Sequence, residues 1–241
     1  MILRRIATAV IARLPIGLRE AANHVVLELT FRKRHLAGLR KARNYRGRTG
    51  MALHLGCGSE IKEGWVNVDL HPAADLTLDA REPLPFADNS FRIIYSEHFL
   101  GCFSYPGVIT QLLSECYREL ELGGIHAFCV PDGRKLLRHY TTREYPGYDE
   151  AHRACHPEWC DTPMDHVLYS LQDGGRYRWY YDEENMGRLL QRVGFVDIRK
   201  RPFDPTLDQA FRRIGSMYQE CRKPTASATE RKERSVAVGA G

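Results

Sequence analysis

Residues 53–59 read Leu-His-Leu-Gly-Cys-Gly-Ser, an apolar run that leads directly into a turn with two glycines. From residue 51 onward, short apolar runs alternate with loops and amphipathic segments, which is the pattern of a parallel α/β sheet. Glycines after the first strand of such a sheet let a ligand approach the backbone at its carboxyl edge. The stretch therefore predicts an α/β fold with a ligand site at that edge.

The remaining apolar runs predict where the other strands and helices lie. A helix is expected at 108–121, ended by Gly123-Gly124, and another at 182–193, ended by Gly194. The long stretch 131–180 has no clear period and is crowded with Arg, His, Tyr and Trp, so we interpret it as a functional insertion. The expected strands are 52–55, 65–69, 76–79, 92–96, 125–130, 195–200 and 216–221.

Composition excludes several classes of protein. The chain has 241 residues, 43% hydrophobic, with no long uninterrupted apolar run, which argues against an integral membrane protein, a disordered chain and a fibre. Seven scattered cysteines, an odd number, indicate reduced thiols and a cytoplasmic location. The length fits one α/β domain with modest additions.

Residues 1–49 form a basic arm. The first 50 residues carry 12 Lys and Arg but only Glu20 and Glu28 as acids. Helical spacing predicts a short helix over 2–14 and a second over 18–35, the latter with an apolar face. A basic amphipathic helix suits a membrane surface, and packing on the body or on a second subunit, as in a homodimer, is the alternative. We divide the chain into this arm, a domain at 50–223 and a disordered tail at 224–241.

An acidic residue ends the second predicted strand, and another ends the third. Asp69 ends Trp-Val-Asn-Val-Asp at 65–69, and Asp79 ends the following run. A carboxylate at the end of the second strand can accept both hydroxyl hydrogens of a ribose. Because strand ends converge on one crevice, we expect Gly56, Gly58, Asp69 and Asp79 to line one pocket for a ribose-bearing cofactor.

The chain resembles the class I S-adenosylmethionine-dependent methyltransferases, in particular small bacterial members that act on glycans or lipids. The resemblance covers residues 51 to about 131 well and 175–223 loosely, and it implies a Rossmann-like, doubly wound, mostly parallel seven-stranded sheet with an antiparallel last strand. It rests on Leu-His-Leu-Gly-Cys-Gly (53–58), Gly-Trp-Val-Asn-Val-Asp-Leu (64–70), Leu-Pro-Phe-Ala-Asp-Asn-Ser-Phe (84–91), Tyr-Ser-Glu-His-Phe-Leu (95–100) and Glu-Leu-Gly-Gly-Ile (121–125).

The resemblance implies S-adenosylmethionine as cofactor and assigns it a set of residues. The glycine turn would pack on its methionine part, Asp69 would hold the ribose, and Asp79 with the Ala80 amide would recognise the adenine. Residues 96–98 would lie nearest the transferred methyl group. The full set of expected cofactor residues is Gly56, Cys57, Gly58, Asp69, Leu70, Asp79, Ala80 and Ser96.

Several positions depart from the family pattern. His54 and Glu60 stand where an acid and a third glycine are common, and Arg92 and Gly101 replace an Asp and part of a Glu-His pair. The stretch 58–65 is too short for a full crossover helix, so we expect a turn there and a more open pocket. These departures keep a non-catalytic, methyltransferase-like docking module open as an alternative.

His98 is the ionisable residue best placed to act on an acceptor. A hydroxyl acceptor must lose a proton, and imidazole is suited to take it near neutral pH. We hypothesise that His98 is this base and that Glu97 orients it or meets the cofactor's ammonium group; a purely structural His98 is the alternative.

The insertion 131–180 is expected to form a lid over the acceptor. Aromatic faces bind sugars, and arginines bind phosphate or carboxylate. A metal cluster is also conceivable, but the spacing of its residues does not demonstrate convergence, so no metal is predicted. Its candidate ligands are His152, Cys155, His156, Cys160, Asp161, Asp165 and His166. The expected acceptor residues are Arg134, His139, Tyr140, His156, His166 and Tyr177.

The sequence thus predicts O-methylation of a sugar or glycan hydroxyl, with a lipid or phenolic acceptor as alternative. Nucleic acid is disfavoured as partner because 95–98 lacks the Asx-Pro-Pro-Tyr signature of base methylation. A nicotinamide-dependent oxidoreductase is disfavoured because residues 56–61 lack the third glycine of the dinucleotide fingerprint.

Overall fold

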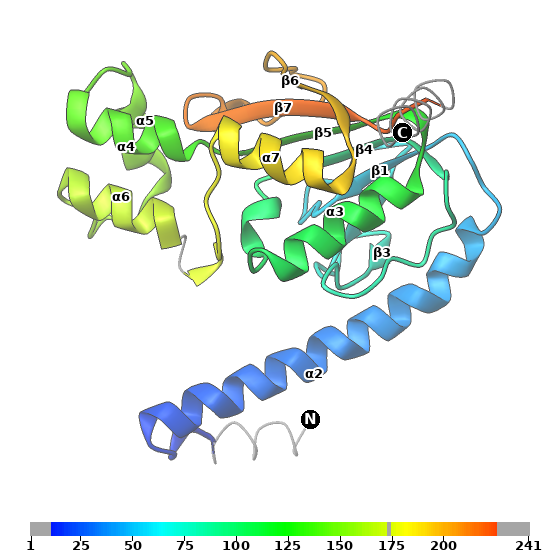
Figure 1. The fold of residues 1–241 in the computed structure, drawn as a ribbon. Coiled ribbons are helices and arrows are strands. Elements are labelled where there is room, and N and C mark those ends of the chain that lie inside the picture. Colours follow the sequence, from blue (N-terminus) through cyan, green and yellow to red (C-terminus); the bar gives the residue numbers. More distant parts are fainter. Residues whose placement is uncertain (1–10, 173–174, 226–241) are drawn as a thin grey trace, which may run out of the picture.

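A seven-stranded sheet forms the centre of the computed structural model, which describes residues 11–172 and 175–225 (Figure 1). The spatial order is β3-β2-β1-β4-β5-β7-β6. Strands β1 to β5 pair in parallel, and β7 pairs antiparallel with both β5 and β6, as predicted. The strands are β1 Met51–Leu55, β2 Val66–Asp69, β3 Leu76–Thr77, β4 Phe91–Glu97, β5 Leu120–Pro131, β6 Val196–Lys200 and β7 Ser216–Arg222.

Two helices, α3 (Gly107–Glu119) and α7 (Glu183–Val193), contact each other and cover one face of the sheet (Figure 1). The predicted apolar stripe of α3 is buried, whereas Gly123-Gly124 does not end that helix but lies inside β5. α7 begins with a capping box between Asp182 and Asn185 and ends at Gly194, whose φ is 114°. Both helices therefore form where the periodicity predicted them.

Irregular segments cover the opposite face of the sheet. Residues 56–65 form turns and extended chain in place of a crossover helix, as expected. Lys62 Nζ donates to the Leu207 carbonyl at 2.7 Å, which ties this turn to the segment before β7. That segment is anchored by Tyr95, whose hydroxyl donates to the buried carboxylate of Asp208 at 2.9 Å.

The insertion is a helical segment, which corrects the interpretation that it lacks periodic structure. It contains α4 (Gly133–Thr142), α5 (Tyr148–Cys155) and α6 (Pro163–Gln172), grouped at one end of the sheet (Figure 1). Its small apolar core consists of Leu136, Tyr148 and Val167. The period was missed because buried positions are occupied by residues such as His139 and Tyr148 as well as by aliphatic ones.

The basic arm contains α2 (Ile16–Ala42), which is longer than predicted. Its second half packs on β3, where Thr77 Oγ1 donates to the Arg34 carbonyl at 2.8 Å and a Cβ at Gly38 would collide with the Thr77 backbone. Its first half extends away from the sheet (Figure 1), and Leu18, Val25 and Leu29 of the predicted apolar face are exposed. The predicted helix over 2–14 and the predicted tail lie largely outside the described residues.

Of the helices in the described ranges, none combines the length and apolar character that crossing a bilayer requires. All seven cysteines are described, and all are free thiols.

Candidate functional site

A cavity of about 980 Å³ opens between the carboxyl edge of the sheet and the helical segment. Gly56, Gly58 and Asp69 line it from β1 and β2, and Glu97 and His98 line it from the end of β4. Its other wall comes from the helical segment and from the residues before β7. The side chains on that wall include Tyr148, His152, His156, Tyr169, Ser170, Arg176, Tyr177, Arg212 and Ser216.

The glycine turn gives a ligand close access to the backbone. Gly58 has a φ of 54° and nothing within 4 Å of where a Cβ would lie, whereas a Cβ on Gly56, with φ of 74°, would collide with the Phe99 ring. The amides of Gly56 and Cys57 donate to the Val68 carbonyl at 2.8 and 3.2 Å. These two amides are already paired, so at this point the turn offers a ligand space rather than free amide donors.

Asp69 lies beside the turn with acceptor capacity left over. Its Oδ2 accepts from the Gly58 amide at 3.0 Å and its Oδ1 from the His71 amide at 2.7 Å. Each carboxylate oxygen can accept a further hydrogen bond, which is what a ribose diol requires. Burial raises the pKa of the neighbouring Cys57 thiol to about 12, so this cysteine stays protonated and is no nucleophile.

Asp79 does not share this cavity, which corrects the expectation of one pocket for all four residues. It lines a separate, smaller cavity of about 320 Å³ with Glu28, His35 and Arg81. Burial alone would raise the pKa of Asp79, but hydrogen bonds and the positive charge of Arg81 lower it below its ordinary value. Arg81 Nη2 is 2.6 Å from Asp79 and 2.7 Å from Glu28 of α2.

Leu70 and Ala80 are likewise placed away from the large cavity. The Leu70 carbonyl accepts from Arg34 of α2 at 2.8 Å, and Ala80 is buried. The ends of β2 and β3 are thus partly used to hold the arm. No local pattern indicates this use, because the contacts come from residues more than 30 positions earlier in the chain.

His98 is held firmly at the edge of the cavity. Its backbone is left-handed, with φ of 51°, and its amide donates to the Cys129 carbonyl at 2.9 Å. Nε2 lies 2.7 Å from Ser216 Oγ, and Nδ1 lies 3.1 Å from the Tyr177 hydroxyl. Burial, and secondarily the charge of Arg212, lowers the pKa of His98 well below its usual value. The ring is therefore neutral at physiological pH, as a general base must be.

Glu97 lines the cavity but does not hydrogen-bond to His98 in the described contacts. Its Oε1 accepts from the Gln209 amide at 3.1 Å, and its Oε2 lies 3.9 Å from Arg212 Nη1. The predicted orienting role thus belongs to Tyr177 and Ser216. Ser96 is fully buried within the sheet, and its hydroxyl has no hydrogen-bond partner among the described residues.

The predicted acceptor residues divide into two groups. Tyr177 and His156 line the cavity, and His166 lies behind His156 with 2.8 Å between their Nδ1 atoms. The other three do not line it. Arg134 pairs with Asp182 at 3.1 Å on the surface, His139 is buried against Asp149 at 2.9 Å, and Tyr140 lies under the guanidinium of Arg143.

Several cavity residues were not assigned a role from the sequence. Ser216 is the first residue of β7, and Arg212 lies in the segment before it. Each is more than 110 positions from its contact, His98 or Glu97, and no local pattern marks either residue. From the sequence, His54 is only a departure from the acid that is common at this position of the family pattern. Burial, and then the charge of Lys62, lowers its pKa to about 4, so a neutral imidazole stands where the family pattern has an acid.

Comparison with known proteins gives matches to solved structures alone. No family model matches the chain, and no curated protein does. The similar structures include a Thermotoga maritima protein described as a S-adenosylmethionine-dependent methyltransferase and possible histamine N-methyltransferase. It is 17% identical over 85% of this chain and 96% of its own, with a TM-score of 0.42.

Two further matches have similar values. A S-adenosylmethionine-dependent methyltransferase from Methanosarcina mazei is 17% identical over 76% of this chain and 96% of its own, with a TM-score of 0.45. A possible exported protein from Bordetella parapertussis is 16% identical over 80% of this chain and 68% of its own, with a TM-score of 0.43.

Proposed function

We propose that this chain is a S-adenosylmethionine-dependent O-methyltransferase. One observation carries the proposal: a single cavity joins an open glycine turn and Asp69 to the neutral His98 and to an aromatic wall. The resemblance assigns this cofactor to three places: the glycine turn after β1, Asp69 at the end of β2, and the residues at the end of β4. All three line this cavity. The bound cofactor would supply a sulfonium-activated methyl group for in-line displacement.

The residues of the cavity fit such a cofactor along most of its length. Gly58 leaves the turn uncovered, and Asp69 retains lone pairs for two hydroxyl groups. Glu97 lies in the same cavity as a partner for an ammonium group. Asp79 does not contact a cofactor in this cavity, because it lines the smaller cavity and forms an ion pair with Arg81. We infer that adenine is recognised mainly by shape and backbone contacts.

His98 would take the proton from the acceptor hydroxyl. Nδ1 faces Tyr177 on the acceptor side, whereas Nε2 is held by Ser216 from β7. Tyr177 and Ser216 therefore act as positioning residues that fix the ring plane. An acceptor whose hydroxyl displaces that of Tyr177 from Nδ1 would donate its proton to the lone pair of this atom, while Nε2 keeps its contact with Ser216.

A sugar or glycan is the acceptor class that the aromatic wall suits best. Tyr148, Tyr169 and Tyr177 supply ring faces and hydroxyl groups, and Arg176 and Arg212 supply positive charge for an attached phosphate or carboxylate. A lipid or phenolic acceptor is the alternative, and a non-catalytic docking module is the alternative outside enzymes. The reduced cysteines support a cytoplasmic location.

For the arm, we propose contact with an anionic membrane surface. The first half of α2 exposes Leu18, Val25 and Leu29 together with Arg19, and Arg32 and Lys33 follow. A helix that exposes both apolar and basic side chains binds headgroups and acyl chains together. A second copy of the chain is the competing occupant.

The cofactor assignment is tested by calorimetric titration with S-adenosylmethionine, S-adenosylhomocysteine and NADH. We expect saturable binding of the first two, at least about tenfold weaker in Asp69→Ala and unchanged in Asp79→Asn, a matched carboxylate outside the cavity. Saturable binding of NADH alone would contradict the proposal. Equal losses in the two variants would show that the pocket is assigned wrongly.

The acceptor class is tested with radiolabelled cofactor and separate pools of glycans, lipids and phenols. We expect label in the glycan pool, in a product that resists mild base as a methyl ether does. Label in the lipid or phenol pool would replace the sugar assignment. Binding without transfer to any pool would favour the docking module.

A further inference from the structure

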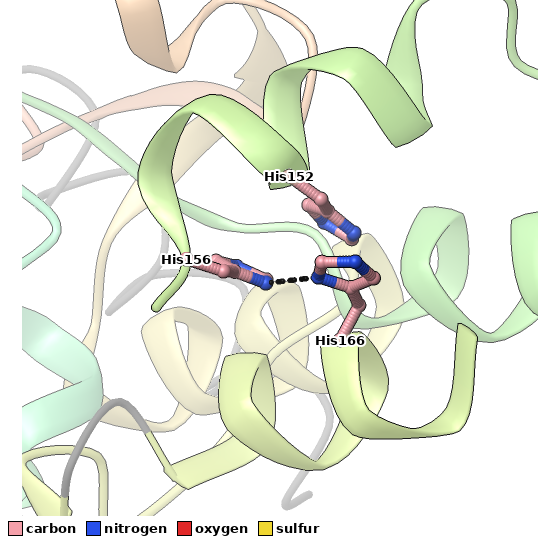
Figure 2. Close-up of side chains that lie close together, drawn as sticks. All are labelled: His152, His156 and His166. Carbon is pink, nitrogen blue, oxygen red and sulfur yellow. Dashed lines mark hydrogen bonds between the residues drawn. The ribbon is translucent and has the colours of Figure 1, made fainter. Parts of the chain in front are cut away.

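Three histidines of the helical segment direct their rings at one point, as Figure 2 shows for His152, His156 and His166. One ring nitrogen from each lies within 4.8 Å of the others. His152 lies in the last turn of α5, His156 follows four positions later as the residue that caps this helix, and His166 comes from the first turn of α6. The i, i+4 spacing places the first two rings on the same side of the helix.

The protonation pattern of His156 suits a metal ligand. Its Nε2 lies 3.4 Å from Ser170 Oγ, which can accept the Nε2 proton. The lone pair of His156 is then on Nδ1, the atom that lies 2.8 Å from Nδ1 of His166. A hydrogen bond that fixes one ring nitrogen while the other points at a ligand position is the usual arrangement around metal-binding histidines.

We propose that His152, His156 and His166 bind a divalent transition metal ion, with Zn²⁺ as the ion that the donor set fits best. Imidazole nitrogens are preferred ligands of Zn²⁺, and three protein ligands with one open position are typical of its reactive sites. Tetrahedral geometry at ordinary zinc–nitrogen lengths separates two ligand nitrogens by about 3.3 Å. The His156–His166 pair therefore needs to open by only about 0.5 Å from its present 2.8 Å.

The open position of this ion would face the large cavity. His152, His156, Tyr169 and Ser170 all line it, in the part formed by the helical segment. An oxygen of water, a hydroxyl group or a carboxylate could occupy the fourth position. The inference deepens the proposed function, on which this last step rests, because it gives the acceptor an anchoring point in the same cavity as His98. Metal binding itself does not depend on methyl transfer.

A second cluster of possible metal ligands in the described residues lacks available donor atoms. Glu97, Cys129 and Asp208 also bring ligand atoms within 4.8 Å of one another. The two oxygens of Asp208 are already taken by Arg201, at 2.5 and 2.6 Å. Burial, with the nearby carboxylates, raises the pKa of Cys129, which keeps its thiol protonated. This cluster is satisfied by an internal ion pair and carries no proposal.

The test uses the full chain, purified without a polyhistidine tag and stripped with a chelator. Titration with Zn²⁺ is followed by calorimetry and titration with Co²⁺ by visible absorption. We expect one equivalent of each and the absorption of a four- or five-coordinate Co²⁺ site. His152→Gln and His166→Gln should weaken binding at least about 100-fold, and Ser170→Ala about tenfold. His24→Gln, an exposed histidine on α2, should bind as the parent does.

A parent protein that binds neither ion overturns the proposal, whatever the variants do. Retained affinity in both glutamine variants, with unchanged circular dichroism, overturns it as well. The two proposals fail separately: chelated protein that binds no S-adenosylmethionine but still takes up Zn²⁺ would remove the proposed function and leave the metal site. Normal binding of S-adenosylmethionine without uptake of Zn²⁺ would remove the metal site and leave the proposed function.

Discussion

The hydroxyl of Tyr177 lies 3.1 Å from Nδ1 of His98, although the two residues are 79 positions apart in the chain. This contact joins the helical segment to the end of β4, inside the cavity that the glycine turn and the helical segment line together. Anything that moves the 175–182 segment therefore also moves the hydrogen-bond partner of the proposed base. Under the proposed function, this geometry couples the binding of an acceptor to the alignment of His98.

Replacing His98 should remove most of the turnover. We expect His98→Ala to lower kcat at least about 100-fold, the usual contribution of a general base, with cofactor affinity unchanged. Tyr177→Phe keeps the aromatic ring but removes the hydrogen bond that orients the imidazole, so kcat should fall only about tenfold. Steady-state kinetics with calorimetry of cofactor binding checks both. A His98→Ala enzyme with most of its turnover would reduce His98 to a structural residue.

The pH dependence of kcat should reflect the depressed pKa of His98. Because burial lowers that pKa well below its ordinary value of 6.5, the base stays deprotonated as the pH falls through 6.5. The acid limb of the profile should therefore lie below pH 6.5, and Arg212→Gln, which removes a nearby positive charge, should move it upward. An acid limb at or above 6.5 in the parent enzyme would contradict the role of this imidazole.

Gly56 and Gly58 should respond differently to the same substitution. Both have positive φ, which costs a residue with a Cβ about 1–2 kcal/mol. Only at Gly56 would the new Cβ also collide with the ring of Phe99. Urea denaturation should therefore show a larger loss of unfolding free energy for Gly56→Ala than for Gly58→Ala. Equal losses would mean that the Phe99 ring moves aside without cost.

Buried His126 should make the protein sensitive to acid. Both of its ring nitrogens lack hydrogen-bond partners among the described residues, and burial lowers its pKa to about 4. The unfolded chain, with an ordinary pKa near 6.5, binds more protons between these values, so the unfolding free energy falls as the pH drops from 6.5 to 4. The full effect is about 3 kcal/mol.

His126→Leu should flatten this part of the pH–stability curve and add about 1 kcal/mol at pH 7.5, because an unsatisfied polar group is removed. His24→Leu, at an exposed site, serves as the control and should leave the slope unchanged. Denaturant titrations at several pH values give the measurement. An unchanged slope in His126→Leu would assign the acid sensitivity to other groups.

The strands and the two main helices could be predicted because aliphatic residues mark them locally. The helical segment could not, because part of its buried face is made of polar aromatic residues such as His139 and Tyr148. The expectation that Asp79 lines the same pocket as Asp69 was wrong for another reason. Its position after a strand is visible in the sequence, but its pairing with Arg81, which reaches Glu28 in the arm, depends on how α2 docks.

The same limit applies to the candidate site. His98 could be selected from its place after the fourth strand, whereas its partner Ser216 lies 118 positions away and has no motif of its own. The three histidines were visible as a group in the sequence. Their convergence depends on the angle between α5 and α6, which no spacing rule determines.

The exposed half of α2 should bind anionic vesicles. Val25→Glu with Leu29→Glu removes apolar area from two side chains that are 56% and 66% exposed, so folding should be little affected. Leu29→Glu also places negative charge one helical turn from Arg32 and Lys33. We expect binding to vesicles with anionic lipid to fall at least about tenfold, and binding of the parent chain to weaken with salt, because Lys and Arg near such a surface contribute about 1 kcal/mol each.

Light scattering on the same two proteins distinguishes membrane binding from the alternative, in which a second copy of the chain covers this face of α2. A parent chain of monomer mass that binds vesicles agrees with the membrane assignment. A dimer that dissociates in the doubly substituted variant, with no vesicle binding by either protein, contradicts it. In that case the apolar face of α2 is a subunit interface, and the Asp79–Arg81–Glu28 contact, at 2.6 and 2.7 Å, serves to hold that interface at a fixed angle to the sheet.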